Sequence, residues 1–163
     1  MNAPGAASGR VLGLAVFLAL GLAAGGAGRL AQGGDVAAEY AALQLPAWAP
    51  STAAFGMVWP VLYVLVAVAG WRVWVVAGGV RRARAALVLW GLQLAVNVAW
   101  PAVFFGLGLV GPAIAVIAAL VVLVVGAIAA FAEHDRTAAL LLTPYLAWLL
   151  YATALNAAVW WLN

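Results

Sequence analysis

Apolar residues run almost without interruption along this chain, and its charged residues fall mainly in short clusters between the apolar runs. The clusters are Arg81, Arg82 and Arg84; Glu133, His134, Asp135 and Arg136; and Asp35 with Glu39. A membrane-spanning helix needs about 20 apolar residues. The charged clusters, with Gly and Pro residues, leave five stretches of about that length, near 11–31, 52–78, 84–106, 109–132 and 137–162. The pattern predicts one domain of five transmembrane helices over residues 1–163.

The five stretches are helical rather than β-stranded in pattern, because they are continuously apolar and rich in Ala and Leu instead of alternating at every second position. Composition agrees with a lipid environment. Of the 163 residues, 69% are hydrophobic and 7% are charged, whereas soluble domains are about half apolar and about a quarter charged. The sequence therefore predicts an all-α membrane protein, a bundle of five transmembrane helices.

Basic residues distribute unequally between the two ends of this bundle. The end that holds the N-terminus and the second and fourth loops has Arg10, Arg72, Arg81, Arg82, Arg84 and Arg136 at or near it, and the other end has Arg29. The positive-inside rule then predicts a cytoplasmic N-terminus and an external C-terminus. We expect the membrane to be a bacterial cell membrane. The net charge of +3 thus reports topology, and no basic stripe indicates a nucleic-acid partner.

The first stretch has a second interpretation, because Arg10 followed by an apolar run and small residues also resembles a signal peptide. The run is long for a signal peptide, so we expect the helix to be retained. Cysteine is absent, which excludes disulfides and thiolate chemistry. The lone His134 stands among charges, as a solvated loop residue does. No catalytic or metal-binding constellation is evident, and we expect no required cofactor.

Polar and aromatic residues of the last stretch share one helical face. At 100° per residue, Tyr145, Trp148, Ala152 and Asn156 fall within an arc of about 80°. In the second stretch Phe55, Trp59 and Tyr63 recur every four residues, and in the third Gln93, Asn97, Trp100 and Phe104 recur at intervals of four, three and four. These faces predict either hydrogen bonds between helices, worth about 0.6–2 kcal/mol each, or a shared cavity.

The nine tryptophans divide between two expected roles. Trp71, Trp74, Trp90, Trp160 and Trp161 lie near predicted helix ends, where an interfacial aromatic belt is expected. Trp59, Trp100 and Trp148 lie deeper and share faces with polar residues, so they fit a cavity wall better. An aromatic cavity with a few amides suits a large, flat ligand of low charge, and it suits ions poorly.

The third stretch carries a further pattern, a seam of small residues. Gly91, Ala95 and Ala99 recur every four residues on roughly the opposite side from the polar face. Small residues at this spacing let another helix approach closely. The seam predicts either a homodimer contact or a helix joint within the bundle.

Three motifs make the chain resemble the TspO/MBR family, the tryptophan-rich sensory proteins that include the translocator protein or peripheral-type benzodiazepine receptor. LPAWAPS is followed by Phe55, Trp59, Leu62 and Tyr63; QLAVNVAW is followed by Phe104, Phe105 and Gly106; and PYLAW is followed by Leu155 and Asn156. The motifs occur in the family's order, and the resemblance covers nearly the whole chain. Glu39, Leu45 and Ser51 depart from the first-loop pattern, and residues 155–163 lack both the Tyr and the following basic residue of the animal sterol motif.

The resemblance implies a pocket that opens toward the first loop and binds porphyrins such as protoporphyrin IX or haem, in a protein that is commonly dimeric. Carried over to this sequence, the pocket residues are Trp48, Phe55, Trp59, Tyr63, Asn97, Trp100, Tyr145, Trp148, Ala152 and Asn156. The implied function is porphyrin sensing, sequestration or transport. Two alternatives stay open: light- and oxygen-dependent porphyrin breakdown at Trp59 and Trp148, and a general small-solute carrier.

Overall fold

The structure is a computed structural model that describes residues 4–163, and the described chain is helical with no β-strand. Its elements in order are α1 (Pro4–Ala31), α2 (Val36–Ala42), α3 (Thr52–Ala77), α4 (Arg84–Pro101), the π-helical turn η1 (Ala102–Gly106), α5 (Val110–Ala132), α6 (Arg136–Leu141) and α7 (Thr143–Leu162). Within this part of the chain, five helical segments are long and apolar enough to cross a membrane: α1, α3, α4 with η1, α5, and α6 with α7. The predicted fold class is confirmed.

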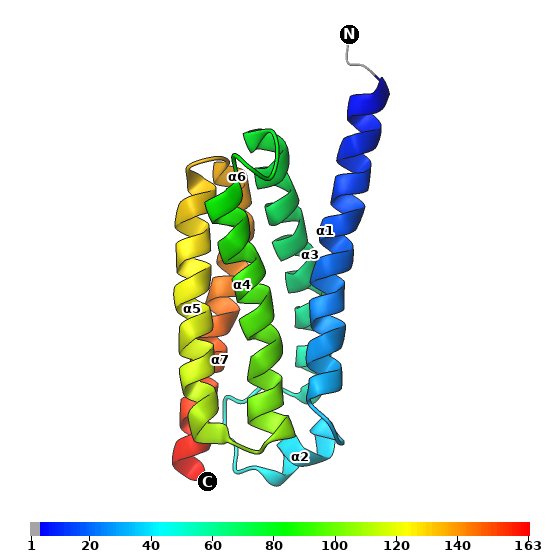
Figure 1. Cartoon of the computed structure of the whole chain (residues 1–163). Helices are drawn as coiled ribbons and strands as arrows, with labels where there is room; N and C mark the ends of the chain where they lie inside the picture. The colour runs from blue at the N-terminus through cyan, green and yellow to red at the C-terminus, as the bar shows by residue number, and fades with distance from the viewer. Residues whose placement is uncertain (1–3) are drawn as a thin grey trace.

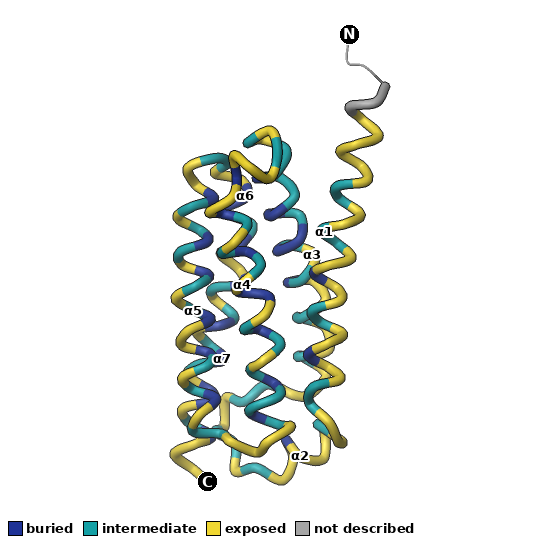
Figure 2. Tube along the Cα trace, viewed as in Figure 1, coloured by how far each residue is buried: buried dark blue, intermediate teal, exposed yellow. Residues whose placement is uncertain are grey.

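The five spans run side by side, with the N-terminus at one end of the bundle and the C-terminus at the other (Figure 1). Helix α1 packs on α3 and α4, whereas α5 packs on α4 and α7. The short helix α2 lies across the end of the bundle near the C-terminus (Figure 1). Buried positions concentrate on the other four spans, while α1 is exposed along most of its length (Figure 2).

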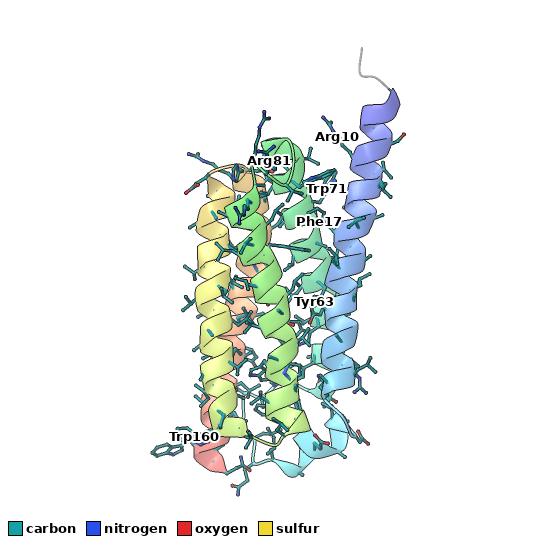
Figure 3. All side chains as sticks on the ribbon, in the orientation of Figure 1. Arg10, Phe17, Tyr63, Trp71, Arg81 and Trp160 are labelled. Carbon is teal, nitrogen blue, oxygen red and sulfur yellow. The ribbon has the colours of Figure 1, made fainter. Side chains whose placement is uncertain are left out.

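The core is made of apolar side chains from α3, α4, α5 and α7, and it includes one tryptophan that was expected at the membrane interface. Trp90 is 6% exposed, and its indole nitrogen donates a hydrogen bond to the carbonyl oxygen of Val66 at 2.9 Å. The ring of Phe17 meets it edge-on at 4.9 Å, and Gly70 leaves it space. The interfacial prediction is therefore wrong for Trp90. Trp160 and Trp161, at 58% and 86% exposure, do lie on the surface, and Figure 3 shows Trp160 there.

The third span changes its helical type before it ends. Pro101, the last residue of α4, cannot donate a backbone hydrogen bond. In the following turn the amide of Leu107 donates to the carbonyl oxygen of Ala102, five residues back, at 2.9 Å. Such π-helical turns are frequent at functional sites. This one brings Phe104 and Phe105 into ring contact with Trp100.

The last span has a short first segment, α6, which begins at a capping residue paired with another helix. The Asp135 carboxylate accepts a hydrogen bond from the backbone amide of Thr137 at 2.9 Å, as an N-cap does. Its second oxygen accepts from the guanidinium of Arg72 on α3 at 2.7 Å. Asp135 therefore ties the start of the fifth span to the end of the second.

We expect the stability contributed by this ion pair to disappear in acid. The hydrogen bond from Arg72 lowers the pKa of the Asp135 carboxyl below its ordinary value. A carboxyl with a lowered pKa stabilises the fold above its unfolded-state pKa, and that stabilisation is lost as the pH falls through the folded-state value. Asp135→Asn keeps a capping side chain, so it should lower the unfolding free energy by up to about 1 kcal/mol at pH 7, the range of partly exposed pairs.

Thermal or detergent unfolding of both proteins at pH 7 and pH 3 measures this difference. The gap between wild type and Asp135→Asn should shrink below about pH 4. An equal difference in stability between the two proteins at pH 7 and pH 3 would contradict a stabilising ion pair between Asp135 and Arg72.

Candidate functional site

A partly open cavity of about 510 Å³ lies at the α2 end of the bundle, lined by residues of α1, α2, α3, α4, η1, α5 and α7. The volume falls within the range of about 300–1,000 Å³ that is usual for small-molecule sites. Its lining is mostly apolar and aromatic: Leu22, Gly25, Gly26, Gly28, Arg29, Gln32, Val36, Ala37, Tyr40, Thr52, Phe55, Gly56, Trp59, Pro60, Tyr63, Asn97, Trp100, Pro101, Phe105, Ile117, Leu120, Trp148, Leu149 and Ala152.

A hydrogen-bonded triad of polar side chains joins three helices beside the cavity. The hydroxyl of Tyr63 on α3 donates to Oδ1 of Asn97 on α4 at 2.5 Å. Nδ2 of Asn97 in turn donates to the hydroxyl oxygen of Tyr145 on α7 at 2.8 Å. Asn97 and Tyr145 are 3% and 2% exposed, so water cannot replace these partners. The triad fixes the tyrosine rings, and Tyr63 lies midway along the bundle between α1 and α4 (Figure 3).

Aromatic rings form the walls around this triad. Trp59 stacks on Tyr63 with ring centroids 5.5 Å apart and planes inclined by 30°. On the facing helix α7, Trp148 meets Phe55 edge-on at 5.8 Å. The indole nitrogen of Trp148 is buried and has no hydrogen-bond partner within the described chain. A buried donor without a partner is unfavourable, and an acceptor that reached this nitrogen would relieve the cost.

The segment between α1 and α3 lines the α2 end of the cavity through Val36, Ala37 and Tyr40, and it is held by specific hydrogen bonds. Tyr40 donates its hydroxyl to the carbonyl oxygen of Pro50 at 3.1 Å, and burial raises the pKa of this hydroxyl. Tyr151 on α7 donates to the carbonyl oxygen of Trp48 at 2.9 Å. Near the C-terminus, the side-chain amide of Asn163 accepts from the backbone amide of Gln44 and donates to its carbonyl oxygen.

The ten pocket residues expected from the sequence take three positions. Seven line the cavity: Phe55, Trp59, Tyr63, Asn97, Trp100, Trp148 and Ala152. Tyr145 lies behind Asn97 and holds it. Asn156 is a support for the wall, since it accepts from the Trp100 indole at 3.1 Å and donates to the carbonyl oxygen of Val110 at 2.8 Å. Trp48 lies outside the cavity lining, 48% exposed against Tyr151.

Residues of α1 and α2 complete the lining, and sequence reasoning missed them. Gly25 packs so closely on Tyr63 that an added Cβ would lie 2.7 Å from its ring. Gly28 faces Pro101, where an added Cβ would make an ordinary contact at 3.5 Å. The Gly-rich run from Gly25 to Gly28 was the available signal, because glycines in a membrane helix mark close approaches. Arg29 and Gln32 follow it at the end of α1.

The small-residue seam of α4 faces away from the bundle. Ala95 and Ala99 are exposed, and a Cβ added at Gly91 would meet no atom within 4 Å. The seam is therefore free of intramolecular helix contacts at these positions, and the homodimer stays a prediction. Among the described residues, no group of three His, Asp or Glu side chains lies close enough to hold a metal ion.

Comparison with known proteins gives one consistent result. The sequence model of the TspO/MBR family matches residues 15–162. The chain is 41% identical to the human translocator protein over 126 residues, covering 74% of this chain and 72% of that protein. It is 32% identical to the tryptophan-rich protein TspO of Chlorobaculum tepidum over 154 residues, covering 94% and 98% of the two chains. It is also 34% identical over 126 residues to protein CrtK of Rhodobacter capsulatus, covering 77% and 79%. With its five apolar spans, the chain is thus an integral membrane protein that belongs to the TspO/MBR family.

Proposed function

We propose that this protein binds porphyrin-type tetrapyrroles, such as protoporphyrin IX or haem, and that it serves to sense, sequester or transport them. The observation that carries the proposal is the convergence of Trp59, Asn97 and Trp148 from three helices on one cavity. Indole and phenol rings supply flat apolar surface for stacking. The side-chain amide of Asn97 and the indole N–H of Trp148, which has no partner in the described chain, supply the few polar contacts that orient a ligand.

The orientation of the site in the membrane is part of the same proposal. The N-terminus and the α3–α4 and α5–α6 connections lie at the end opposite to α2 (Figure 1), and Arg10 and Arg81 extend from that end (Figure 3). The positive-inside rule assigns this basic end to the cytoplasm. The cavity then faces the outer side of a bacterial cell membrane.

Tryptophan fluorescence tests the proposed binding. Protoporphyrin IX added to purified protein should quench the emission in a saturable way. Trp148→Ala removes a ring from the cavity wall and is expected to weaken binding about fivefold to tenfold, which matches an aromatic contact of roughly 1 kcal/mol.

Trp161→Ala is the matched control, because Trp161 is 86% exposed and does not line the cavity. It should bind as wild type does. Equal affinity of all three folded proteins would place any bound porphyrin elsewhere, and the absence of saturable quenching would remove the proposal.

The cavity also favours a second candidate function, porphyrin breakdown driven by light and oxygen, because Trp59 and Trp148 both line it. Irradiation of the complex in air distinguishes this reaction from binding alone. A defined product spectrum that disappears in the Phe variants of both tryptophans is the expected result. Bleaching without a new product, at the same rate in wild type and variants, would exclude breakdown by these residues.

A further inference from the structure

Arg29 is the single charged residue among those that line the cavity. It lies in the last turn of α1, at the α2 end of the bundle. Its guanidinium Nη1 donates to Oε1 of Gln32, also a lining residue, at a long 3.4 Å. Within residues 4–163, the ion pair that forms joins Arg72 to Asp135 at the other end of the bundle. Arg29 therefore has no carboxylate partner in the described chain.

The two acidic residues at this end of the bundle, Asp35 and Glu39, do not line the cavity. Asp35 caps α2, since its carboxylate accepts from the backbone amides of Ala37 and Ala38 at 3.0 and 3.3 Å. Glu39 directs its carboxylate toward Gly34, where an added Cβ would lie 2.8 Å from Oε1. The cavity thus has an uncompensated positive charge at its mouth and aromatic walls further in.

This arrangement offers different surroundings to the apolar and the anionic parts of a ligand. A carboxylate that entered the aromatic interior would lose its hydration without gaining a charged partner, which is strongly unfavourable. A carboxylate at the mouth would meet a guanidinium whose fork of N–H donors matches its two oxygens. Gln32 offers an amide beside it as a further donor.

We infer that Arg29, with Gln32, is a specificity-determining site for the anionic side chains of the ligand. The ligand class is a planar, apolar ring with carboxylates along one edge. When the ligand is bound, these carboxylates lie against Arg29. The inference rests on the proposed binding of porphyrins in this cavity. It adds that the charge of the ligand's edge, and not the ring alone, is recognised.

A comparison of protoporphyrin IX with its dimethyl ester tests this inference, because the two share a ring and differ in the negative charges. Affinities are measured by quenching with the full chain in nanodiscs of phosphatidylcholine, whose zwitterionic headgroups add no net charge. Wild type should bind the free acid about fivefold more tightly than the ester, the size of a solvent-exposed ion pair. In Arg29→Gln the ratio of the two affinities should fall to about one, whereas Arg29→Lys should keep part of the preference for the free acid.

Arg81→Gln is the control for net charge, because Arg81 lies at the opposite end of the bundle (Figure 3). It should keep the full preference for the acid. Raising the salt to about 0.5 M should reduce the preference in wild type, because screening weakens an exposed ion pair, and should leave ester binding unchanged.

Each outcome has a definite meaning. If wild type binds both ligands equally, or if Arg29→Gln keeps the preference for the acid, the inference about Arg29 is wrong and the cavity still binds porphyrin. If wild type binds neither ligand, the proposed function itself fails. If Arg29→Gln does not fold, Arg29→Lys and the salt dependence of wild type decide the question.

Discussion

Replacing Asn97 with leucine is expected to lower the free energy of unfolding by about 2–4 kcal/mol and to weaken porphyrin binding by at least about tenfold. The variant keeps the approximate size of the side chain and removes both hydrogen bonds of the triad, to Tyr63 and Tyr145. A buried polar group that loses its partner costs about 1–3 kcal/mol. Tyr145, at 2% exposure, has no access to water, so most of this loss should appear in the measured stability.

Unfolding of the purified protein by increasing fractions of sodium dodecyl sulfate, followed by circular dichroism, gives the stability change. Tyr145→Phe is the matched control, because it removes the hydroxyl and leaves the ring. The double variant Asn97→Leu/Tyr145→Phe removes both partners of the Asn97–Tyr145 hydrogen bond, so neither is left buried without the other, and the combined loss of stability should be smaller than the sum of the single losses. Strict additivity of the two changes would show that Asn97 and Tyr145 do not act as a pair.

The sequence predicted the helices that carry this triad and the faces that they turn inward, because periodicity within one helix is a local property. Asn97 and Tyr145 were each placed on a polar face. Their pairing depends on the register between α4 and α7, which no pattern within a single helix contains. The same limitation explains Asn156, which lies on the face of Tyr145 but about three turns further along α7, where Val110 and Trp100 meet it.

Trp90 shows why the position of a residue along a helix is a weak guide to its burial within the bundle. Its place near a predicted helix end suggested the membrane interface. The residues that decide its environment, Phe17 on α1 and Gly70 on α3, lie on other helices. The Gly-rich end of α1 was missed for a related reason: glycines contribute to a cavity through the close approach that they permit, and a search for polar and aromatic side chains does not detect them.

Gly106→Ala is expected to destabilise the protein by about 1–3 kcal/mol, the usual range for overpacking. Gly106 has no positive φ, so alanine fits its backbone conformation. The obstacle is space, since an added Cβ would lie 2.6 Å from the carbonyl oxygen of Ala31, where the π-helical turn η1 meets the end of α1. Backbone at this contact must shift, and the shift should reach Gln32 and weaken porphyrin binding as well.

Gly126→Ala is the matched control for this substitution. Its added Cβ would make ordinary contact with the Leu89 side chain at 3.8 Å, and alanine in a helix interior is favoured over glycine by about 0.5–1 kcal/mol. Sodium dodecyl sulfate unfolding should therefore show opposite signs for the two variants: a loss at Gly106 and no loss or a small gain at Gly126. If Gly106→Ala is as stable as wild type and binds porphyrin equally well, the contact between η1 and α1 does not shape the cavity, and Arg29 is held at its mouth by α1 alone.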